Sequence, residues 1–350
     1  MPTTIHGTNG ITFNDGSTQN TRPAVGFRNR IINGDMRIDQ RSSGAAFSVG
    51  TGAVYGSCDR WGSLAAASGV WTQRRTATTL TDFPFGMRIQ RTAGSTSTAA
   101  CYIGQVIETT NCADLAGQSV TLSFDAIAGA NFSAASFIVT VELWSGTGTD
   151  QGWGSLNAAT WSSQIAILNV AQSITTTKTR YSFTAAVPSG VNELGVRFYA
   201  VGTGTAGASD FFEITGVQLE AGSTATSFER RPIGTELALC QRYYSRHGGT
   251  ASAGNYVSIC NGYMYSALQW ESLYAFPVEM RVAPSFSTSA LSNLVLRNTL
   301  AVPTSFLSYL PSTRSTLLYT ANPSSGSAGY SQGLFVNSGT TGFIEFSAEL

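Results

Sequence analysis

Carboxylates are the side chains through which this sequence could carry out acid–base chemistry. Two carboxyl groups about 5–10 Å apart can hydrolyse a glycosidic bond. Most of the candidates stand beside arginines or at outward positions of predicted strands, which favours ion pairing or solvation over catalysis. These candidates are Asp35, Asp39, Asp59, Asp125, Glu142, Asp210 and Glu213.

The two histidines offer little for nucleophilic catalysis. His6 lies in a polar N-terminal segment, and His247 stands at the end of a predicted helix. No Gly-x-Ser-x-Gly elbow precedes His247, and no serine or cysteine stands out as its partner. The sequence has no phosphate-binding loop, dinucleotide fingerprint or EF-hand loop, and no set of metal ligands stands out. We therefore predict no catalytic residues, no metal ligands and no cofactor.

Three tryptophans bracket a segment rich in glycine, serine and threonine, "WSGTGTDQGWGSLNAATW". Trp153 stands between glycines, away from any alternating pattern, so we expect its ring to be exposed. An exposed aromatic ring can stack on the C–H face of a pyranose. Aromatic rings are also enriched at contacts between subunits. The segment thus predicts either a carbohydrate site or a subunit contact at Trp144, Trp153 and Trp161.

The stretch Arg28–Arg41, "RNRIINGDMRIDQR", carries six charged residues among fourteen, whereas charged residues make up 11% of the chain. A second short piece, "CDRW" at Cys58–Trp61, complements it. Because arginine pairs well with carboxylates, we predict a structural cluster that holds the first strand against the "CDRW" strand. The same cluster could form a subunit seam, and a ligand site is the alternative to both structural roles. The predicted cluster comprises Asp35, Arg37, Asp39, Arg41, Asp59 and Arg60, covered by Trp61.

The composition narrows the classes of function. The chain has 350 residues, 42% of them hydrophobic, and its 20 basic residues balance 20 acidic ones. Nucleic-acid-binding proteins carry a basic excess, so we expect no nucleic-acid partner. No apolar run reaches about 18 residues, so we expect no membrane insertion. The N-terminus has no signal-peptide pattern and the five cysteines lack CxxC spacing, which fits synthesis in a cytoplasm.

Alternating apolar residues predict an all-β chain. Connections rich in glycine and serine, about ten to twenty residues apart, are typical of a jelly roll or sandwich. A change of phase at Gly216 predicts a β-bulge. Strands are predicted at Ser119–Phe124, Ser136–Trp144, Glu193–Val201 and Phe211–Glu220.

A single short helix is predicted between two β domains. Thr235 can serve as its N-cap, and Glu236 then lies in the first turn, where the helix dipole favours a carboxylate. Gly248 and Gly249 predict its end, after about Ser245. An N-terminal arm with a hairpin turn at Asn14–Gly16 precedes these parts. We expect the arm at 1–25, a jelly-roll β-sandwich at 26–231, the linking helix at 232–250 and a smaller β-sandwich at 251–350.

The charged stretch resembles the start of a domain found in tail-fibre and other virion appendage proteins of tailed bacteriophages. That family's pattern is N-x-x-I-N-G-x-[MF]-x-x-x-Q-R, followed by Y-x-x-D-R-W. In this sequence three residues rather than two separate Tyr55 from Asp59. The segment Gly216–Tyr244 is similar to the far end of the same domain, and its Q-L-E-x-G…F-E-x-R-P run is the most specific part. The positions that match the first pattern are Asn29, Ile32, Asn33, Gly34, Met36, Gln40, Arg41, Tyr55, Asp59, Arg60 and Trp61.

The resemblance implies a carbohydrate-binding-module-like jelly roll in a homotrimeric, non-enzymatic virion protein on the tail or particle surface. We expect residues 1–25 to contact other virion proteins and the β domains to bind host cell-surface polysaccharide. A capsid head fibre, a decoration protein or a tail adaptor with a purely structural role is the alternative. A polysaccharide depolymerase fits less well, because no repeat predicts the long solenoid that such enzymes need.

Overall fold

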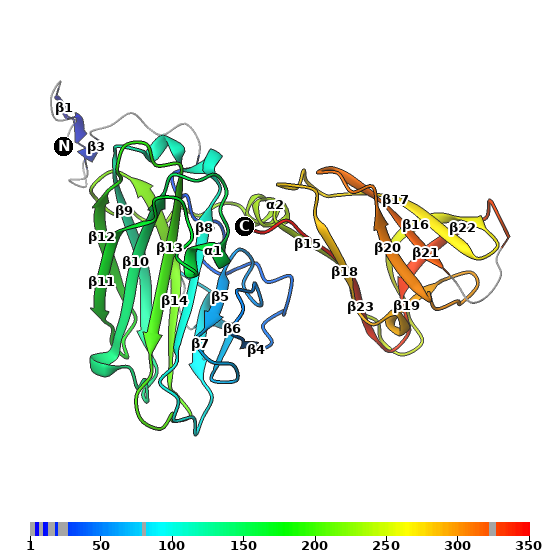
Figure 1. Cartoon of the computed structure of the whole chain (residues 1–350), viewed down its shortest axis with the longest axis horizontal. Coiled ribbons are helices and arrows are strands. Elements are labelled where there is room, and N and C mark those ends of the chain that lie inside the picture. Colours follow the sequence, from blue (N-terminus) through cyan, green and yellow to red (C-terminus); the bar gives the residue numbers. More distant parts are fainter. Residues whose placement is uncertain (1–3, 7–9, 13–17, 20–26, 79–81, 322–326) are drawn as a thin grey trace.

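The computed structural model shows an almost entirely β chain, as predicted. Two β-sheet bodies lie along its long axis, with helix α2 (Ile233–Gln241) between them (Figure 1). The residues that the structure describes are 4–6, 10–12, 18–19, 27–78, 82–321 and 327–350.

The first body is a sandwich of two antiparallel sheets. The five-stranded sheet has the order β11-β10-β13-β8-β5, and the six-stranded sheet has the order β12-β9-β14-β7-β6-β4. The strands of the five-stranded sheet are β5 (Gly62–Ala65), β8 (Ala100–Ile107), β10 (Ile138–Gly146), β11 (Ile165–Ser173) and β13 (Glu193–Val201). Those of the six-stranded sheet are β4 (Phe47–Val49), β6 (Trp71–Ala77), β7 (Phe85–Arg91), β9 (Ser119–Ala128), β12 (Thr179–Ala186) and β14 (Phe211–Ala221).

The core of this sandwich follows the predicted period of two. Leu122 and Phe124 point inward from β9, and Phe198 meets them from the opposite sheet, its ring centroid 4.9 Å from that of Phe124. The predicted bulge in β14 is confirmed, because the register with β9 shifts between Thr215 and Gln218. Gly216 has a φ of 59° there, in the left-handed region that glycine adopts without strain.

The second body also consists of two antiparallel sheets, with the orders β15-β23-β18 and β19-β22-β16-β17-β21-β20. Its core contains Trp270, Leu318, Leu334 and Phe346, separate from the core of the first body. Its strands are β15 (Tyr244–Thr250), β16 (Val257–Ser266), β17 (Gln269–Ala275), β18 (Ser285–Thr288), β19 (Leu294–Leu296), β20 (Ser305–Tyr309), β21 (Ser315–Ala321), β22 (Ser331–Val336) and β23 (Thr341–Ser347).

The linking helix is shorter than predicted. Helix α2 follows Pro232, so the prediction of Thr235 as its N-cap is wrong. The predicted end near Ser245 is also wrong, because the chain enters β15 at Tyr244 and pairs with β23. Pairing with β23 decides the conformation here, and Gly248 serves within a strand rather than as a helix stop. His247 accordingly lies in a strand and not at a helix end.

Smaller elements complete the described chain. Strands β1 (Thr4–His6), β2 (Gly10–Thr12) and β3 (Thr18–Gln19) form an antiparallel sheet, and the predicted turn Asn14–Gly16 between β2 and β3 lies outside the described residues. The remaining helical segments are α1 (Trp153–Asn157) and the 3-10 turns Thr109–Asn111, Ala113–Leu115, Ala135–Phe137 and Leu291–Asn293.

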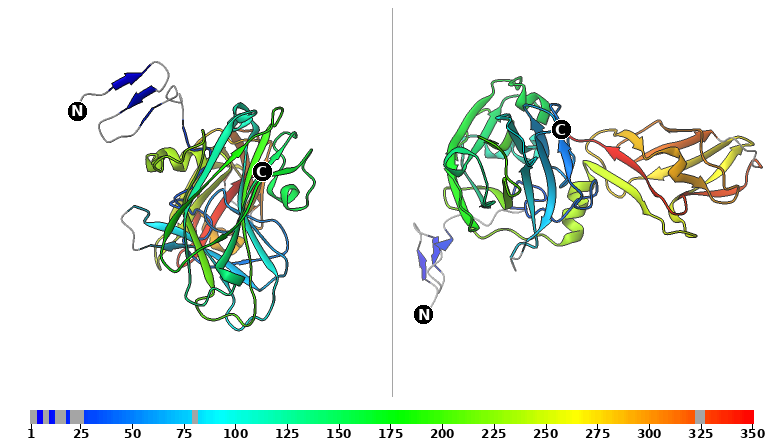
Figure 2. Two further views of the ribbon diagram at one scale, coloured as in Figure 1. Left: turned by 90° about the vertical axis from the view of Figure 1, so that its left-hand side faces the viewer. Right: turned by 90° about the horizontal axis from the view of Figure 1, so that it is seen from below.

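The end of the chain returns to the first body. After β23 the backbone runs back to the junction, where the C-terminal end lies beside the first sandwich (Figure 2). The carbonyl of Leu350 accepts hydrogen bonds from the Trp153 amide at 3.1 Å and from the Tyr55 hydroxyl at 2.6 Å. The second body is therefore held to the first at both of its ends.

Candidate functional site

Trp153 is buried, with 1% of its surface exposed, so the prediction that its ring is exposed is wrong. The segment around it forms helix α1, which places the ring over β5 and β8. A Cβ added at Gly62 or Gly104 would lie 2.6 Å from the indole of Trp153, so glycine at these two positions makes room for the ring. Alternation along a strand could not reveal this burial, because the ring packs from helix α1 onto glycines elsewhere in the chain.

The other two tryptophans of the predicted carbohydrate site are also occupied within the chain. Trp161 is buried and its indole N–H donates to the Gly152 carbonyl at 3.2 Å. Trp144 is half-buried, donates to the Glu142 carboxylate at 3.0 Å and is contacted by the Arg197 guanidinium. Neither ring offers an open face comparable to the one predicted for stacking on a sugar.

The predicted charge cluster forms only some of the expected pairs. Arg37 pairs with Asp35 at 2.6 Å, and Arg41 lies 3.7 Å from Asp59. Asp39 pairs with no arginine among the described residues. Its carboxylate accepts hydrogen bonds from the backbone amides of Ser42 and Gly44 instead. The stretch from 27 to 46 is not a strand, so the predicted pairing of two strands through these charges is wrong.

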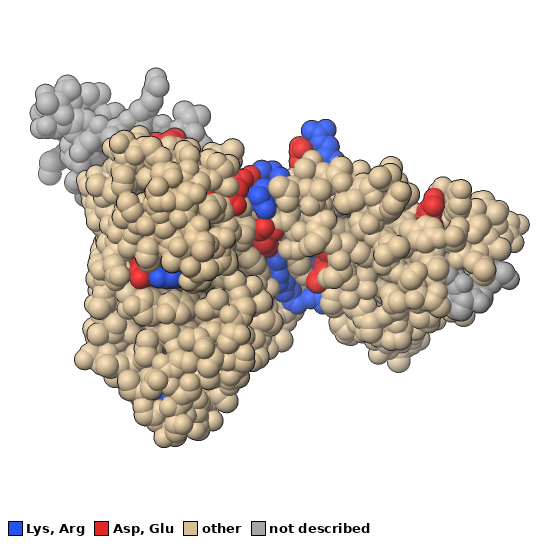
Figure 3. Space-filling model, viewed as in Figure 1, with Lys and Arg blue, Asp and Glu red and all other residues tan. Residues whose placement is uncertain are grey.

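One partner of this cluster could not be predicted from the sequence. Glu349, next to the end of the chain, forms ion pairs with both Arg41 and Arg60. The two guanidinium groups also stack on tyrosines that follow α2, 3.5 Å and 3.6 Å from the ring centroids of Tyr244 and Tyr243. Charged residues accordingly gather between the two bodies (Figure 3). The cluster joins the bodies and does not form an open site.

Burial shifts the protonation equilibria at this junction. Asp59 is buried, which raises its pKa from 3.8 to about 6 against the opposing effects of Arg41 and Gln40. Burial alone would also raise the pKa of Glu108, but hydrogen bonds from Arg242 and Tyr243 hold it below its ordinary value.

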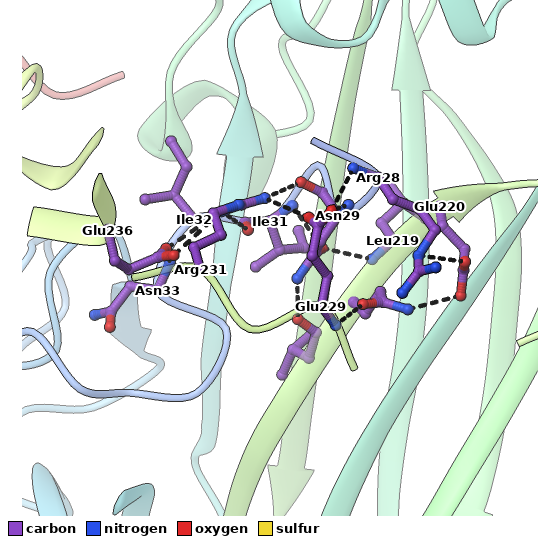
Figure 4. Close-up of polar contacts among 12 residues, drawn as sticks. Arg28, Asn29, Ile31, Ile32, Asn33, Leu219, Glu220, Glu229, Arg231 and Glu236 are labelled. Carbon is purple, nitrogen blue, oxygen red and sulfur yellow. Dashed lines mark hydrogen bonds and ion pairs between the residues drawn. The ribbon is translucent and has the colours of Figure 1, made fainter. Parts of the chain in front are cut away.

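The two segments that resemble virion appendage proteins meet in space (Figure 4). The Asn29 side chain donates to the Val217 carbonyl at 3.0 Å and accepts from the Leu219 amide at 3.1 Å. Both backbone amides of Arg28 and Asn29 donate to Glu229 at 2.9 Å. These motif residues therefore hold the entering chain against β14 and the segment before α2, which is a structural role.

A cavity of about 430 Å³ lies on the outward face of the six-stranded sheet, and we call it the face cavity. Its walls combine apolar carbons with charged and hydroxyl groups, which is the mixture that binds polar organic ligands. The lining residues are Ala77, Thr78, Gly86, Arg88, Asp125, Ala126, Ile127, Thr177, Lys178, Glu213, Ile214 and Thr215.

The register of the sheet explains why these residues converge. Glu213 on β14 stands opposite Arg88 on β7 and opposite Ile127 on β9. Thr215 stands opposite Asp125, which in turn faces Arg180 on β12. Since side chains alternate between the faces of a sheet, these outward positions form two adjacent rows across the cavity.

The charged side chains of the face cavity form ion pairs with one another and with Arg180. Arg88 contacts Glu213 at 2.5 Å, and its guanidinium also lies 3.8 Å from the Phe211 ring centroid. Asp125 accepts from Arg180 at 2.7 Å and lies 3.8 Å from Lys178. Both carboxylates are thus paired with arginines, and such charge-assisted pairs suit hydrogen bonding to a ligand.

Lys178 is the only lysine of the chain and lines this cavity. Partial burial lowers its pKa, an effect that Asp125 and Asp82 oppose and that Arg180 and Arg230 reinforce. Its ammonium lies 4.4 Å from the Phe83 ring centroid. The sequence marks Asp125 and Glu213 as candidate carboxylates, but nothing in it connects them with Lys178. Only the register between strands that are distant in the sequence could have shown that these side chains converge.

His247 has a local role. Its Nε2 lies 2.8 Å from the Ser245 hydroxyl, and its ring packs edge-on against Tyr274. Burial lowers the pKa of His247. Ser245 is completely buried, so its hydroxyl is not placed to attack a substrate from solvent. Among the described residues, no cluster of His, Cys, Asp and Glu could hold a metal ion. No helix in that part of the chain is long and apolar enough to cross a membrane.

No protein-family model and no curated protein matches this chain. Similar solved structures include one described as CBM4 structure and function (15% identity, TM-score 0.31), which covers 54% of this chain and 98% of its own. A putative sugar-binding protein from Bacteroides thetaiotaomicron (14% identity, TM-score 0.33) covers 55% of this chain and 100% of its own. The enzymatically active domain of tailspike protein 4 of bacteriophage CBA120 (15% identity, TM-score 0.32) covers 56% of this chain and 22% of its own. Similarity at these sequence identities and TM-scores does not assign a function to this chain.

Proposed function

We propose that this chain is a non-enzymatic virion protein of a tailed bacteriophage, a tail fibre or similar peripheral appendage. In this proposal the first sandwich binds host cell-surface polysaccharide in the face cavity. The face cavity is the observation that carries the proposal. A sugar ring presents hydroxyl groups that need charged or hydroxyl partners and C–H groups that need apolar contact. The side chains of Arg88, Glu213 and Asp125 supply the former, and Ile127 and Ala77 supply the latter.

The virion role is supported by the resemblance of the two motif segments to phage appendage proteins. The segments are far apart in the sequence, yet Asn29 and Glu229 bring them into direct contact. A shared structural purpose of this kind explains why both motifs occur together. Attachment of residues 1–25 to other virion proteins belongs to the same proposal, although most of that arm lies outside the described residues.

Assembly into a homotrimer is supported by the outer face of the second body's large sheet. Leu273 on β17 is 75% exposed and stands opposite Leu317 on β21, which stands opposite Tyr309 on β20. Contiguous exposed apolar residues on a sheet face favour contact between chains. Sedimentation velocity should show trimers for the wild type and monomers for Leu273→Asp. A wild-type monomer at micromolar concentration would contradict this part of the proposal.

The binding experiment uses the full chain and a panel of polysaccharides extracted from bacterial surfaces. Ala77→Trp places a large ring at an exposed cavity wall, and we expect it to abolish binding without unfolding the sheet. Ala186→Trp is the matched control, because Ala186 is an exposed alanine on the same sheet outside the cavity. A bound polysaccharide should also slow acetylation of Lys178, and the signal is unambiguous because the chain has no other lysine.

The structural alternative, a head fibre, decoration protein or tail adaptor, is supported by the same apolar face around Leu273. It predicts trimers that bind no polysaccharide on the panel. Absence of catalysis is tested in parallel. If the protein released reducing sugars from a bound polysaccharide, and Glu213→Gln stopped the release, the chain would be a depolymerase instead.

A further inference from the structure

Arg74 is an unpaired cation next to the face cavity. It points outward from β6, the strand whose Ala77 and Thr78 line the cavity, and it stands directly opposite Arg88 on β7. Among the arginines that the structure describes, Arg74 is the one whose side chain makes no hydrogen bond, ion pair or contact with an aromatic ring. Every other arginine in the described part of this sparsely charged chain has a partner for its side chain.

Two like charges directly opposite each other on neighbouring strands repel and destabilise the pair. Arg88 cannot relieve this repulsion, because its guanidinium is already engaged by Glu213 and by the Phe211 ring. No carboxylate of the described chain pairs with Arg74. An anion supplied from outside would offset this repulsion by pairing with Arg74.

The balance of charge on this face of the sheet also favours an anionic ligand. The cations are Arg74, Arg88, Lys178 and Arg180, whereas the carboxylates are Glu213 and Asp125. Lys178 and Arg180 share the single carboxylate of Asp125. Asp82 and Arg230 also act on Lys178, with opposite signs that offset each other. The face therefore carries an excess of two positive charges in a chain whose formal net charge is zero.

We propose that the polysaccharide bound at the face cavity is acidic, and that Arg74 pairs with a carboxylate on one of its sugar units. The inference rests on the proposed function, because it names the chemical class of the glycan for that same cavity. A guanidinium matches a carboxylate with two parallel charge-assisted hydrogen bonds, whereas a neutral sugar offers it only hydroxyl acceptors and no opposite charge. Glu213 and Asp125 remain available to the hydroxyl groups of the same ligand.

The test compares polygalacturonate with its carboxyl-reduced form, which has the same backbone but no charge, and adds dextran sulfate and neutral dextran. We expect the wild type to bind polygalacturonate about tenfold more tightly than the reduced form. Arg74→Gln should remove this difference without lowering the melting temperature, because the Arg74 side chain has no partner to lose and its repulsion with Arg88 is relieved. Arg314→Gln, which removes an exposed arginine of the second body, is the control for non-specific attraction.

Each outcome decides between the two proposals. Equal binding of the acidic and reduced polymers, with Ala77→Trp abolishing both, would overturn the inference and keep the proposed function. Preference for dextran sulfate over polygalacturonate, lost in Arg74→Gln, would assign a sulfated glycan and overturn the carboxylate. If neither these polymers nor any polysaccharide of the bacterial panel bound, the proposed function would fail and the inference with it.

Discussion

Arg60 and Glu349 form an ion pair in which 1% and 7% of the two side chains are exposed, and they belong to different bodies of the chain. The pair connects a residue of the first sandwich's entry segment to the last residues after β23. Arg41 shares the same carboxylate at 3.1 Å. A single glutamate at the end of the chain thus neutralises two arginines at the junction between the bodies.

Glu349→Gln should weaken this junction. It leaves Arg60 buried without a carboxylate, and removal of one partner from a buried ion pair costs about 3–5 kcal/mol of unfolding free energy. Urea unfolding followed by tryptophan fluorescence measures the loss. Glu279→Gln is the control, because its pair with Arg314 is exposed and should contribute nothing measurable. Equal effects of the two substitutions would contradict the role assigned to Glu349.

Asp59 should make the protein less stable as the pH rises. Its pKa is about 6 in the folded chain and 3.8 in the unfolded chain. The stability that Asp59 contributes is therefore fully present below pH 3.8 and is lost as the pH rises through 6. The difference corresponds to about 3 kcal/mol. Asp59→Asn removes this dependence. The stability of the wild type minus that of the variant should therefore fall between pH 4 and pH 7, as measured by urea unfolding.

Gly34→Ala should destabilise the first sandwich by about 2 kcal/mol or more, since a Cβ at this position would lie 2.1 Å from the Val217 carbonyl oxygen. The backbone of Gly34 also accepts a hydrogen bond from the Val217 amide at 3.0 Å. Gly52→Ala is the matched control, because nothing lies within 4 Å of its added Cβ. Thermal unfolding of both variants decides whether close approach explains glycine at position 34.

Trp153→Ala should reduce stability and is therefore a poor probe of binding. Removal of a fully buried aromatic ring costs about 3–5 kcal/mol and leaves a cavity. The variant should also loosen the contact with Leu350, which limited proteolysis at the junction would detect. Retention of wild-type thermal stability would show that the ring is not packed as described. Loss of glycan binding in this variant alone would not identify a sugar site.

The sequence predicted the architecture better than the sites. Strand alternation predicted the strands that carry core residues such as Leu122 and Phe198, because the pattern within each strand indicates its own buried face. The bulge at Gly216 was visible for the same local reason. Burial of Trp153 depends on glycines at distant positions, and pairing of Arg60 depends on a residue nearly three hundred positions later. Local pattern carries no information about such contacts.

The helix and the face cavity show the same limit. The glycines after α2 satisfied the rule for a helix end, yet pairing with β23 placed His247 and Gly248 in a strand. Lys178, Arg88 and Glu213 come from three parts of the chain, and only the strand order β12-β9-β14-β7 brings them together. The resemblance did single out the two segments that contain Asn29 and Glu229, since both segments have recognisable residue patterns. It did not predict that the two residues are in contact.

The second body is attached to the first at two places, through α2 at its beginning and through Glu349 and Leu350 at its end. Strands β15 and β23, which follow and precede these attachments, lie side by side in one sheet. A sideways force at the far tip of this body would therefore act on two chain segments in parallel, and neither could swivel alone. The molecule would transmit torque from its tip to the first sandwich as one stiff body and not as two bodies that rotate independently.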